Sequence, residues 1–143
     1  MAIPSHHFWL KYRIALSLSL LAIAPLGYWV RFSGFGPAWF HDGAGSVAYE
    51  IFWIFLAAFF LPTAAPSKIA VGVCLATCGL EFLQLWQPPW LQALRATLPG
   101  RLVLGNTFTW SDFFSYFIGS FGGWVGLRSL RYWLRATAQI NSR

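Results

Sequence analysis

Charged residues are scarce in this sequence, and acidic residues are the scarcest of them. Only four of the 143 residues are Asp or Glu, and charged residues of both signs make up 10% of the chain. A typical soluble domain is about 25% charged, so this chain has too few charges to cover a water-soluble domain. Hydrophobic residues make up 57% and aromatic residues 20%. We therefore expect an all-α membrane protein, folded as a single integral membrane domain over residues 1–143.

The sequence also lacks the motifs of common catalytic and metal sites. Its two cysteines, Cys74 and Cys78, are four residues apart in one apolar run. This spacing suits neither a structural disulfide nor, without further ligands, a zinc site. The three histidines are scattered, and there is no phosphate-binding glycine loop or paired nucleophile and base. These absences predict no metal and no cofactor, and they favour a protein that is not an enzyme.

What the sequence has instead is four apolar runs, close to the ~20 residues that a spanning helix needs. Pro62 ends the second run and Pro88 ends the third. A fifth segment, residues 90–104, contains two arginines, a proline and a glycine, and is too polar and broken to span. We expect it to be a loop or a re-entrant or interfacial segment. The predicted transmembrane helices are residues 14–31, 44–61, 69–86 and 112–128.

The first apolar run also resembles a secretory signal peptide. Lys11 and Arg13 precede it, and the Ala-Ile-Ala sequence at residues 22–24 has the pattern of a cleavage site. Pro25 directly follows that site and disfavours cleavage, and the apolar residues continue to residue 30. We favour an uncleaved spanning helix that is bent at Pro25.

The basic residues set the expected orientation in the membrane. Four spans put both termini on one side, together with seven of the ten basic residues, and such residues favour the cytoplasm. We therefore expect a multi-pass protein of the bacterial cytoplasmic membrane, with the lipid bilayer as its partner and both termini cytoplasmic. The net charge of +6 reflects this asymmetry and does not indicate nucleic-acid binding. The seven are Lys11, Arg13, Lys68, Arg128, Arg131, Arg135 and Arg143; the other three are Arg31, Arg95 and Arg101.

All four acids fall near the side of the membrane opposite the termini. Glu50 and Glu81 lie one to two turns inside the second and third spans, and Asp112 opens the fourth. An ionised carboxylate at mid-helix costs about 3 kcal/mol on insertion scales. We therefore predict that these carboxylates pair with an arginine of the segment between the third and fourth spans. The predicted polar cluster comprises Glu50, Glu81, Gln84, Arg95, Arg101, Asp112 and Tyr116.

Simpler roles remain open for two of these acids. Asp112 also suits a helix N-terminus, where the helix dipole favours an anion and Thr109 is placed to act as a cap. Glu50 is alternatively protonated, or its side chain reaches the interface.

Glycines follow Asp112 at helical spacing. Gly119-x-x-x-Gly123 and Gly122-x-x-x-Gly126 are pairs of small residues that let two membrane helices approach closely. We predict that these four glycines are helix-packing positions rather than ligand-binding positions.

The polar pattern resembles that of a small bacterial membrane family. It consists of Glu81-x-x-Gln84, then Arg95, then Asp112 opening the next helix with Tyr116 and glycines behind it. On these residues the chain resembles the family designated domain of unknown function 2809, over most of residues 20–126, and is similar in outline to the VanZ-like proteins. The resemblance implies a membrane protein of four or five helices. VanZ-like proteins are associated with glycopeptide resistance, and the first family has no known role.

Three functions are compatible with these features. The first is a non-catalytic protein that assists or modulates a membrane or envelope complex, with another membrane protein as its partner. The second is an enzyme or binding protein for a lipid-linked or amphipathic molecule at the outer leaflet, with Glu81 or Asp112 as acid or base. The third is a small proton-coupled transporter that uses Glu50 and Glu81. We favour the first, for which we expect the acids to form a closed set of hydrogen bonds.

Overall fold

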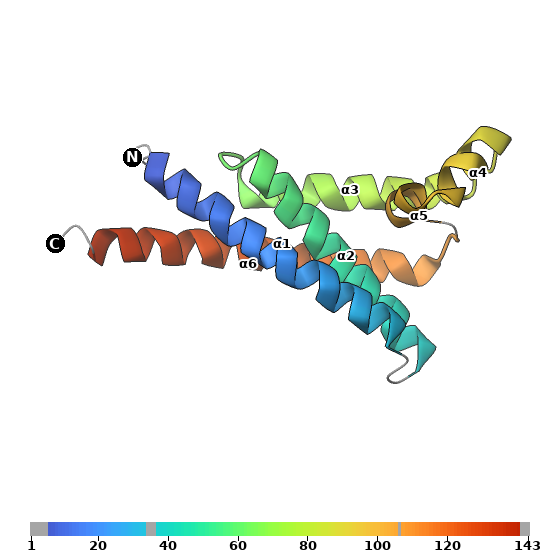
Figure 1. Ribbon diagram of the computed structural model, residues 1–143, viewed down its shortest axis with the longest axis horizontal. Coiled ribbons are helices and arrows are strands. Elements are labelled where there is room, and N and C mark those ends of the chain that lie inside the picture. Colours follow the sequence, from blue (N-terminus) through green and yellow to red (C-terminus); the bar gives the residue numbers. More distant parts are fainter. Residues whose placement is uncertain (1–5, 34–36, 106, 141–143) are drawn as a thin grey trace.

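The computed structural model describes residues 6–33, 37–105 and 107–140, and all the regular structure in these residues is α-helical. Figure 1 shows how the helices are arranged along the long axis of the molecule. In chain order the helices are α1 (His6–Phe32), α2 (Ala38–Phe60), α3 (Pro66–Gln84), α4 (Pro89–Ala96), α5 (Leu98–Leu104) and α6 (Trp110–Ile140).

Prolines mark the starts of several helices. Pro37 is the N-cap residue of α2, Pro66 is the first residue of α3, and Pro88 and Pro89 open α4. Proline suits these positions because the first N–H groups of a helix have no intrahelical acceptor. Pro25 lies inside α1 instead, and the helix continues through it.

The four long helices, α1, α2, α3 and α6, form a bundle in which α2 has the central position (Figure 1). α2 packs against α1, α3 and α6, and α3 also packs against α6. Both chain ends lie at one end of the bundle, together with the turn from α2 to α3; we call this the terminal end. α4, α5, the end of α1 and the start of α2 lie at the other end, which we call the distal end.

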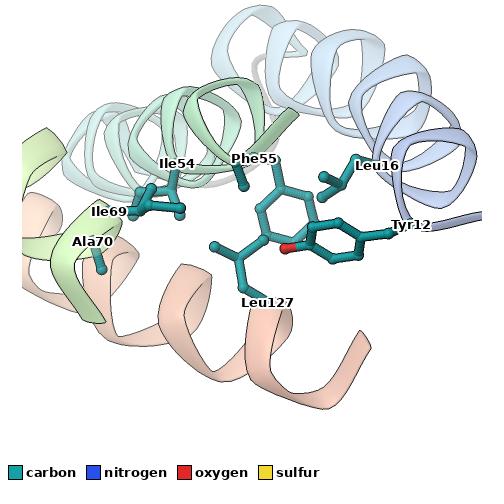
Figure 2. Packing of buried hydrophobic residues seen from close by; sticks show 8 residues of the cluster. Tyr12, Leu16, Ile54, Phe55, Ile69, Ala70 and Leu127 are labelled. Carbon is teal, nitrogen blue, oxygen red and sulfur yellow. The ribbon is translucent and has the colours of Figure 1, made fainter. Parts of the chain in front are cut away.

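An apolar cluster joins the four long helices in the half of the bundle nearer the termini (Figure 2). Tyr12 and Leu16 of α1, Ile54 of α2 and Leu127 of α6 are completely buried in it. In a bilayer such contacts stabilise a bundle through van der Waals packing, because lipid tails are as apolar as the side chains. The remaining members are Phe55, Ala58, Ile69 and Ala70.

Three helices are long and apolar enough to cross a membrane: His7–Arg31, Ala38–Phe60 and Pro66–Gln84. The prediction of an all-α fold with membrane-type helices is confirmed at this level. The fourth predicted span lies in α6, which does not reach the same mean hydropathy because serines, glycines and Asp112 dilute its apolar residues. α6 is nevertheless packed among the other three helices.

The helix ends differ from the predicted spans. α2 begins at Ala38, so His41 and Asp42 lie in a helix rather than in the expected connection. Residues 90–104 form most of two short helices, α4 and α5, rather than a loop. α6 continues beyond residue 128 to Ile140. Hydropathy locates the apolar part of a helix, whereas its ends depend on caps and hydrogen bonds.

Candidate functional site

Glu81 is the centre of a buried polar group at the distal end. Its Oε1 accepts a hydrogen bond from the Tyr116 hydroxyl at 2.6 Å and another from Gln84 Nε2 at 3.3 Å. Its Oε2 accepts from the backbone N–H of Thr109 at 3.4 Å. The Glu81 side chain is 2% exposed, and both oxygens are occupied by donors from α3, α6 and the segment before α6.

Local geometry explains why these groups meet. Gln84 follows Glu81 by one turn of α3, so the two side chains share a face. Gly105 has a φ of +63°, and a Cβ there would lie 2.5 Å from Gln84 Nε2. A residue with a side chain is therefore disfavoured at this position both by the backbone and by the space. The glycine lets the chain pass closely over Gln84 on its way to α6.

Asp112 lies beside a different partner. Its Oδ1 accepts a hydrogen bond from the Ser46 hydroxyl at 2.9 Å, which links the start of α6 to α2. Nearby, Arg31 of α1 and Asp42 of α2 form an ion pair at 2.7 Å. That pair is half exposed, and it is the one ion pair within residues 6–33, 37–105 and 107–140.

Glu50 lies deepest of the acids and is completely buried. Its Oε1 accepts a hydrogen bond from the Ser120 hydroxyl of α6 at 2.7 Å. Its Oε2 has no hydrogen-bond partner among the described residues. Toward the termini, the next turns present the apolar side chains of Ile54 and Leu127. The acids and their hydrogen-bond partners therefore end at Glu50 and do not continue into the apolar cluster.

Arg95 does not pair with any of these carboxylates. Its Nη2 donates to the carbonyl of Leu83 at 2.8 Å and its Nη1 to the carbonyl of Trp86 at 3.2 Å. The last carbonyls of a helix lack intrahelical donors, so the guanidinium acts as a cap at the C-terminal end of α3. The prediction that an arginine neutralises the acids is wrong for Arg95, because its guanidinium donates to two backbone carbonyls and has no carboxylate of the described residues within 4 Å.

Arg101 is also separate from the acids. It is exposed on α5, and its guanidinium has no hydrogen-bond or ion-pair partner among the described residues. It borders a hollow of about 290 Å³ that opens at the distal end. The hollow is lined by Gln87, Gln92, Arg95, Ala96 and Arg101.

The four glycines of α6 differ in how closely they approach α2. A Cβ at Gly119 would lie 2.7 Å from Glu50 Cβ, and one at Gly123 would lie 2.8 Å from Ile54 Cδ1. At Gly126 the nearest atom is Phe55 Cζ at 3.0 Å, whereas at Gly122 it is Ile51 Cδ1 at 3.6 Å. All four face α2, and Gly119 and Gly123 form the closest contact.

Sequence reasoning missed Arg131 as a structural residue. Its Nη2 donates to the carbonyls of Pro62 at 2.9 Å and Ala64 at 2.8 Å, in the turn from α2 to α3. Its guanidinium also lies over the ring of Tyr12, 5.0 Å from the centroid. A sequence signal was present, because Gly119, Gly123, Leu127 and Arg131 recur every four residues and so share the buried face of α6.

The polar side chains thus form two chemically different groups. Glu50, Glu81 and Asp112 use hydroxyl, amide and backbone donors, whereas Arg95 and Arg131 donate to backbone carbonyls. The acid group can hold three helices in register, since it links α2, α3 and α6 through Glu50, Glu81 and Asp112. The arginine-lined hollow, in contrast, is open at the distal end.

Comparison with known proteins places these features in a family. No solved structure matches the chain. The family described as "Protein of unknown function (DUF2809)" matches residues 35–120. This range contains α2, α3, α4, α5 and the beginning of α6, including all the predicted acids and Arg95, and it leaves out α1 and Arg131. The match covers more than half of the sequence and agrees with the resemblance carried by Glu81, Gln84 and Asp112, so the chain belongs to the DUF2809 family.

Proposed function

We propose that the protein is an integral membrane protein with four spans, formed by α1, α2, α3 and α6. The support for α6 as a span is its close packing on α2 through Gly119 and Gly123, together with its course alongside α3 in Figure 1. Its 31 residues extend about 46 Å, more than the ~30 Å hydrocarbon layer of a bilayer. The excess length leaves the basic end of α6 at the membrane surface.

The proposed orientation puts the terminal end in the cytoplasm of a bacterial cell. The basic residues at that end include Lys11, Lys68 and Arg135, which are exposed, and they outnumber those at the distal end. Arg143, which was counted on the same side, lies outside the described residues. The cytoplasmic membrane is the membrane that this orientation fits.

Within this membrane we propose a non-catalytic role, as an accessory or modulator of a membrane or envelope complex. The observation that carries the proposal is the closed hydrogen bonding of Glu81, whose two oxygens accept three hydrogen bonds from the protein itself. A general acid or base must be within reach of its substrate, and Glu81 is 2% exposed. Its contacts are those of a side chain that fixes helix positions.

The transporter hypothesis has less support. A proton-coupled carrier needs polar groups that give access to both sides of the membrane. Between Glu50 and the terminal end lies the apolar cluster, whose members other than Tyr12 have no polar side-chain atom. The acids and their hydrogen-bond partners therefore do not form a continuous path across the bundle.

The second candidate, a VanZ-like protein acting on a lipid-linked or amphipathic molecule, is favoured by one specific observation. The hollow beside Arg95 and Arg101 is open and basic, and it lies away from the acids. It suits binding of an anionic group, but it contains no acid or base to act on one. A binding role at this place is compatible with the non-catalytic proposal.

The test is complementation of a strain that lacks the gene, using Asp112→Asn and Glu50→Gln. Each amide keeps an oxygen that can accept from Ser46 or Ser120 and removes the titratable proton. An accessory role predicts that both variants restore the deletion phenotype wherever they accumulate in the membrane at wild-type level. A variant that accumulates with a wild-type melting temperature but does not complement would contradict the proposal and favour an enzyme or a proton carrier.

A further inference from the structure

The hollow between α4 and α5 is lined by hydrogen-bond donors in a segment without acids. From residue 82 to residue 111 the sequence contains Arg95 and Arg101 but no Asp or Glu. The side chains of Gln87 and Gln92 complete the polar lining. Neither arginine can therefore pair with a carboxylate from within this stretch.

The two guanidiniums also keep their positive charge uncompensated by the rest of the described chain. Arg95 is 5% exposed and donates to two neutral carbonyls, and its Nε has no partner among the described residues. Arg101 has no carboxylate within 4 Å in those residues. Two unpaired guanidiniums on one hollow repel each other, and an anion placed between them relieves that repulsion.

The other faces of α4 and α5 indicate how deep the hollow lies in a membrane. Trp90 and Leu94 of α4, and Leu98 and Leu102 of α5, are all exposed. Helices of eight and seven residues are too short to span, so these apolar side chains fit a pair of helices lying in the interface. Trp86 packs edge to face against Trp90, and tryptophan is enriched at that depth. The hollow therefore lies at the level of lipid phosphates.

We propose that this hollow binds a phosphate group, carried either by an anionic lipid headgroup or by a soluble phosphate ester. Arginine is the side chain best suited to phosphate, because its planar guanidinium offers paired N–H donors. Arg101 is the residue free to make such contacts, Arg95 supplies a fixed positive charge behind it, and Gln87 and Gln92 offer amide donors. The inference rests on one part of the proposed function, the insertion of the four long helices in a membrane, and does not depend on the accessory role.

The experiment uses the full chain purified in a neutral detergent. Melting temperature is followed as phosphatidylglycerol, phosphatidylcholine or glycerol 1-phosphate is added at constant ionic strength. Wild type is compared with Arg101→Gln, which removes an exposed guanidinium that holds no other part of the fold. Arg13→Gln is the control, because it removes an exposed guanidinium of the terminal end, which lies over the Phe59 ring at 5.7 Å. Arg95 is not changed, because it caps α3.

We expect phosphatidylglycerol to raise the melting temperature more than phosphatidylcholine does, and Arg101→Gln to weaken its apparent affinity about tenfold, the loss expected for a hydrogen bond to a charged group. Arg13→Gln should bind like wild type. A response to glycerol 1-phosphate with the same dependence on Arg101 identifies a soluble ester as the source, whereas a response to the lipid alone identifies a headgroup.

The proposal would be overturned if wild type and Arg101→Gln had equal affinities for the ligand. It would also be overturned if Arg101→Gln and Arg13→Gln lost affinity equally, since only general surface charge would then be acting. Neither result would affect the complementation expected of Asp112→Asn and Glu50→Gln. The two proposals therefore fail independently.

Discussion

At the scale of single residues, Glu50, Glu81 and Asp112 are stabilised by hydroxyl and amide donors rather than by arginines. Glu81 accepts from Tyr116, Gln84 and a backbone N–H, and Glu50 accepts from Ser120. Such donors hydrogen-bond to a buried carboxyl group without bringing a second charge into the bundle, and the desolvation of that charge would add its own cost.

The Tyr116 hydroxyl gives a direct test at this scale. Tyr116→Phe removes the 2.6 Å hydrogen bond to Glu81 and leaves that buried oxygen with only its longer contact to Gln84. We expect a loss of about 1–2 kcal/mol in the free energy of unfolding, measured by denaturing detergent in mixed micelles. Tyr49→Phe is the control, because its hydroxyl donates to the carbonyl of Val103 at an exposed position. Equal effects of the two changes would contradict the structural role of Glu81.

At the scale of helices, the bundle depends on the contact between α2 and α6. Gly119 and Gly123 bring the α6 backbone against Glu50 and Ile54, which are themselves one turn apart on α2. The same close approach brings Ser120 within hydrogen-bond distance of Glu50. Helix packing and polar contacts are therefore coupled along this face.

Alanine substitutions at Gly119 and Gly122 distinguish the effect of close helix packing from the effect of helix propensity. Gly119→Ala places a Cβ 2.7 Å from Glu50 Cβ, so α2 and α6 must move apart, and we expect a loss of about 1–3 kcal/mol in the free energy of unfolding. Gly122→Ala gains the same helix propensity but meets its nearest atom, Ile51 Cδ1, at 3.6 Å. It should be neutral or slightly stabilising. The free energy of unfolding in mixed micelles is measured for both variants. Equal changes in the two variants would exclude close α2–α6 packing at Gly119.

Arg131 provides the corresponding test at the terminal end. Arg131→Gln removes two hydrogen bonds to the turn between α2 and α3 and the contact with the Tyr12 ring. We expect a loss of about 2–3 kcal/mol in the free energy of unfolding. The control is Arg135→Gln, since Arg135 is exposed and lies over the Phe8 ring at 5.9 Å. If Arg135→Gln were as destabilising as Arg131→Gln, basic charge rather than the carbonyl contacts would be responsible.

At the scale of the whole molecule, the sequence predicts apolar helices better than it predicts which polar side chains meet. Apolar runs and prolines such as Pro62 and Pro88 locate the long helices, because both act locally. The spacing of Gly119 and Gly123 indicates a packed face of α6. The hydrogen-bond partner of Arg95 could not be predicted from the sequence, because backbone carbonyls and carboxylates are both possible acceptors for an arginine. Only the path of α4 past the end of α3 determines that the acceptors are carbonyls.

The central claim is that four helices span the membrane with the terminal end in the cytoplasm. Among these helices α6 is the least apolar. The most direct test of this claim is cysteine accessibility to a membrane-impermeant maleimide in intact cells. The cells express the protein with Cys74→Ala and Cys78→Ala, so that it has no other cysteine. Single cysteines replace three exposed residues: Ser67 at the start of α3, Ala93 on α4 and Ala138 near the end of α6. We predict that Ala93→Cys is labelled from outside, and that Ser67→Cys and Ala138→Cys are labelled only after the cells are opened. Labelling of Ala93→Cys and Ala138→Cys from the same side would mean that α6 does not cross the membrane, and would contradict the account.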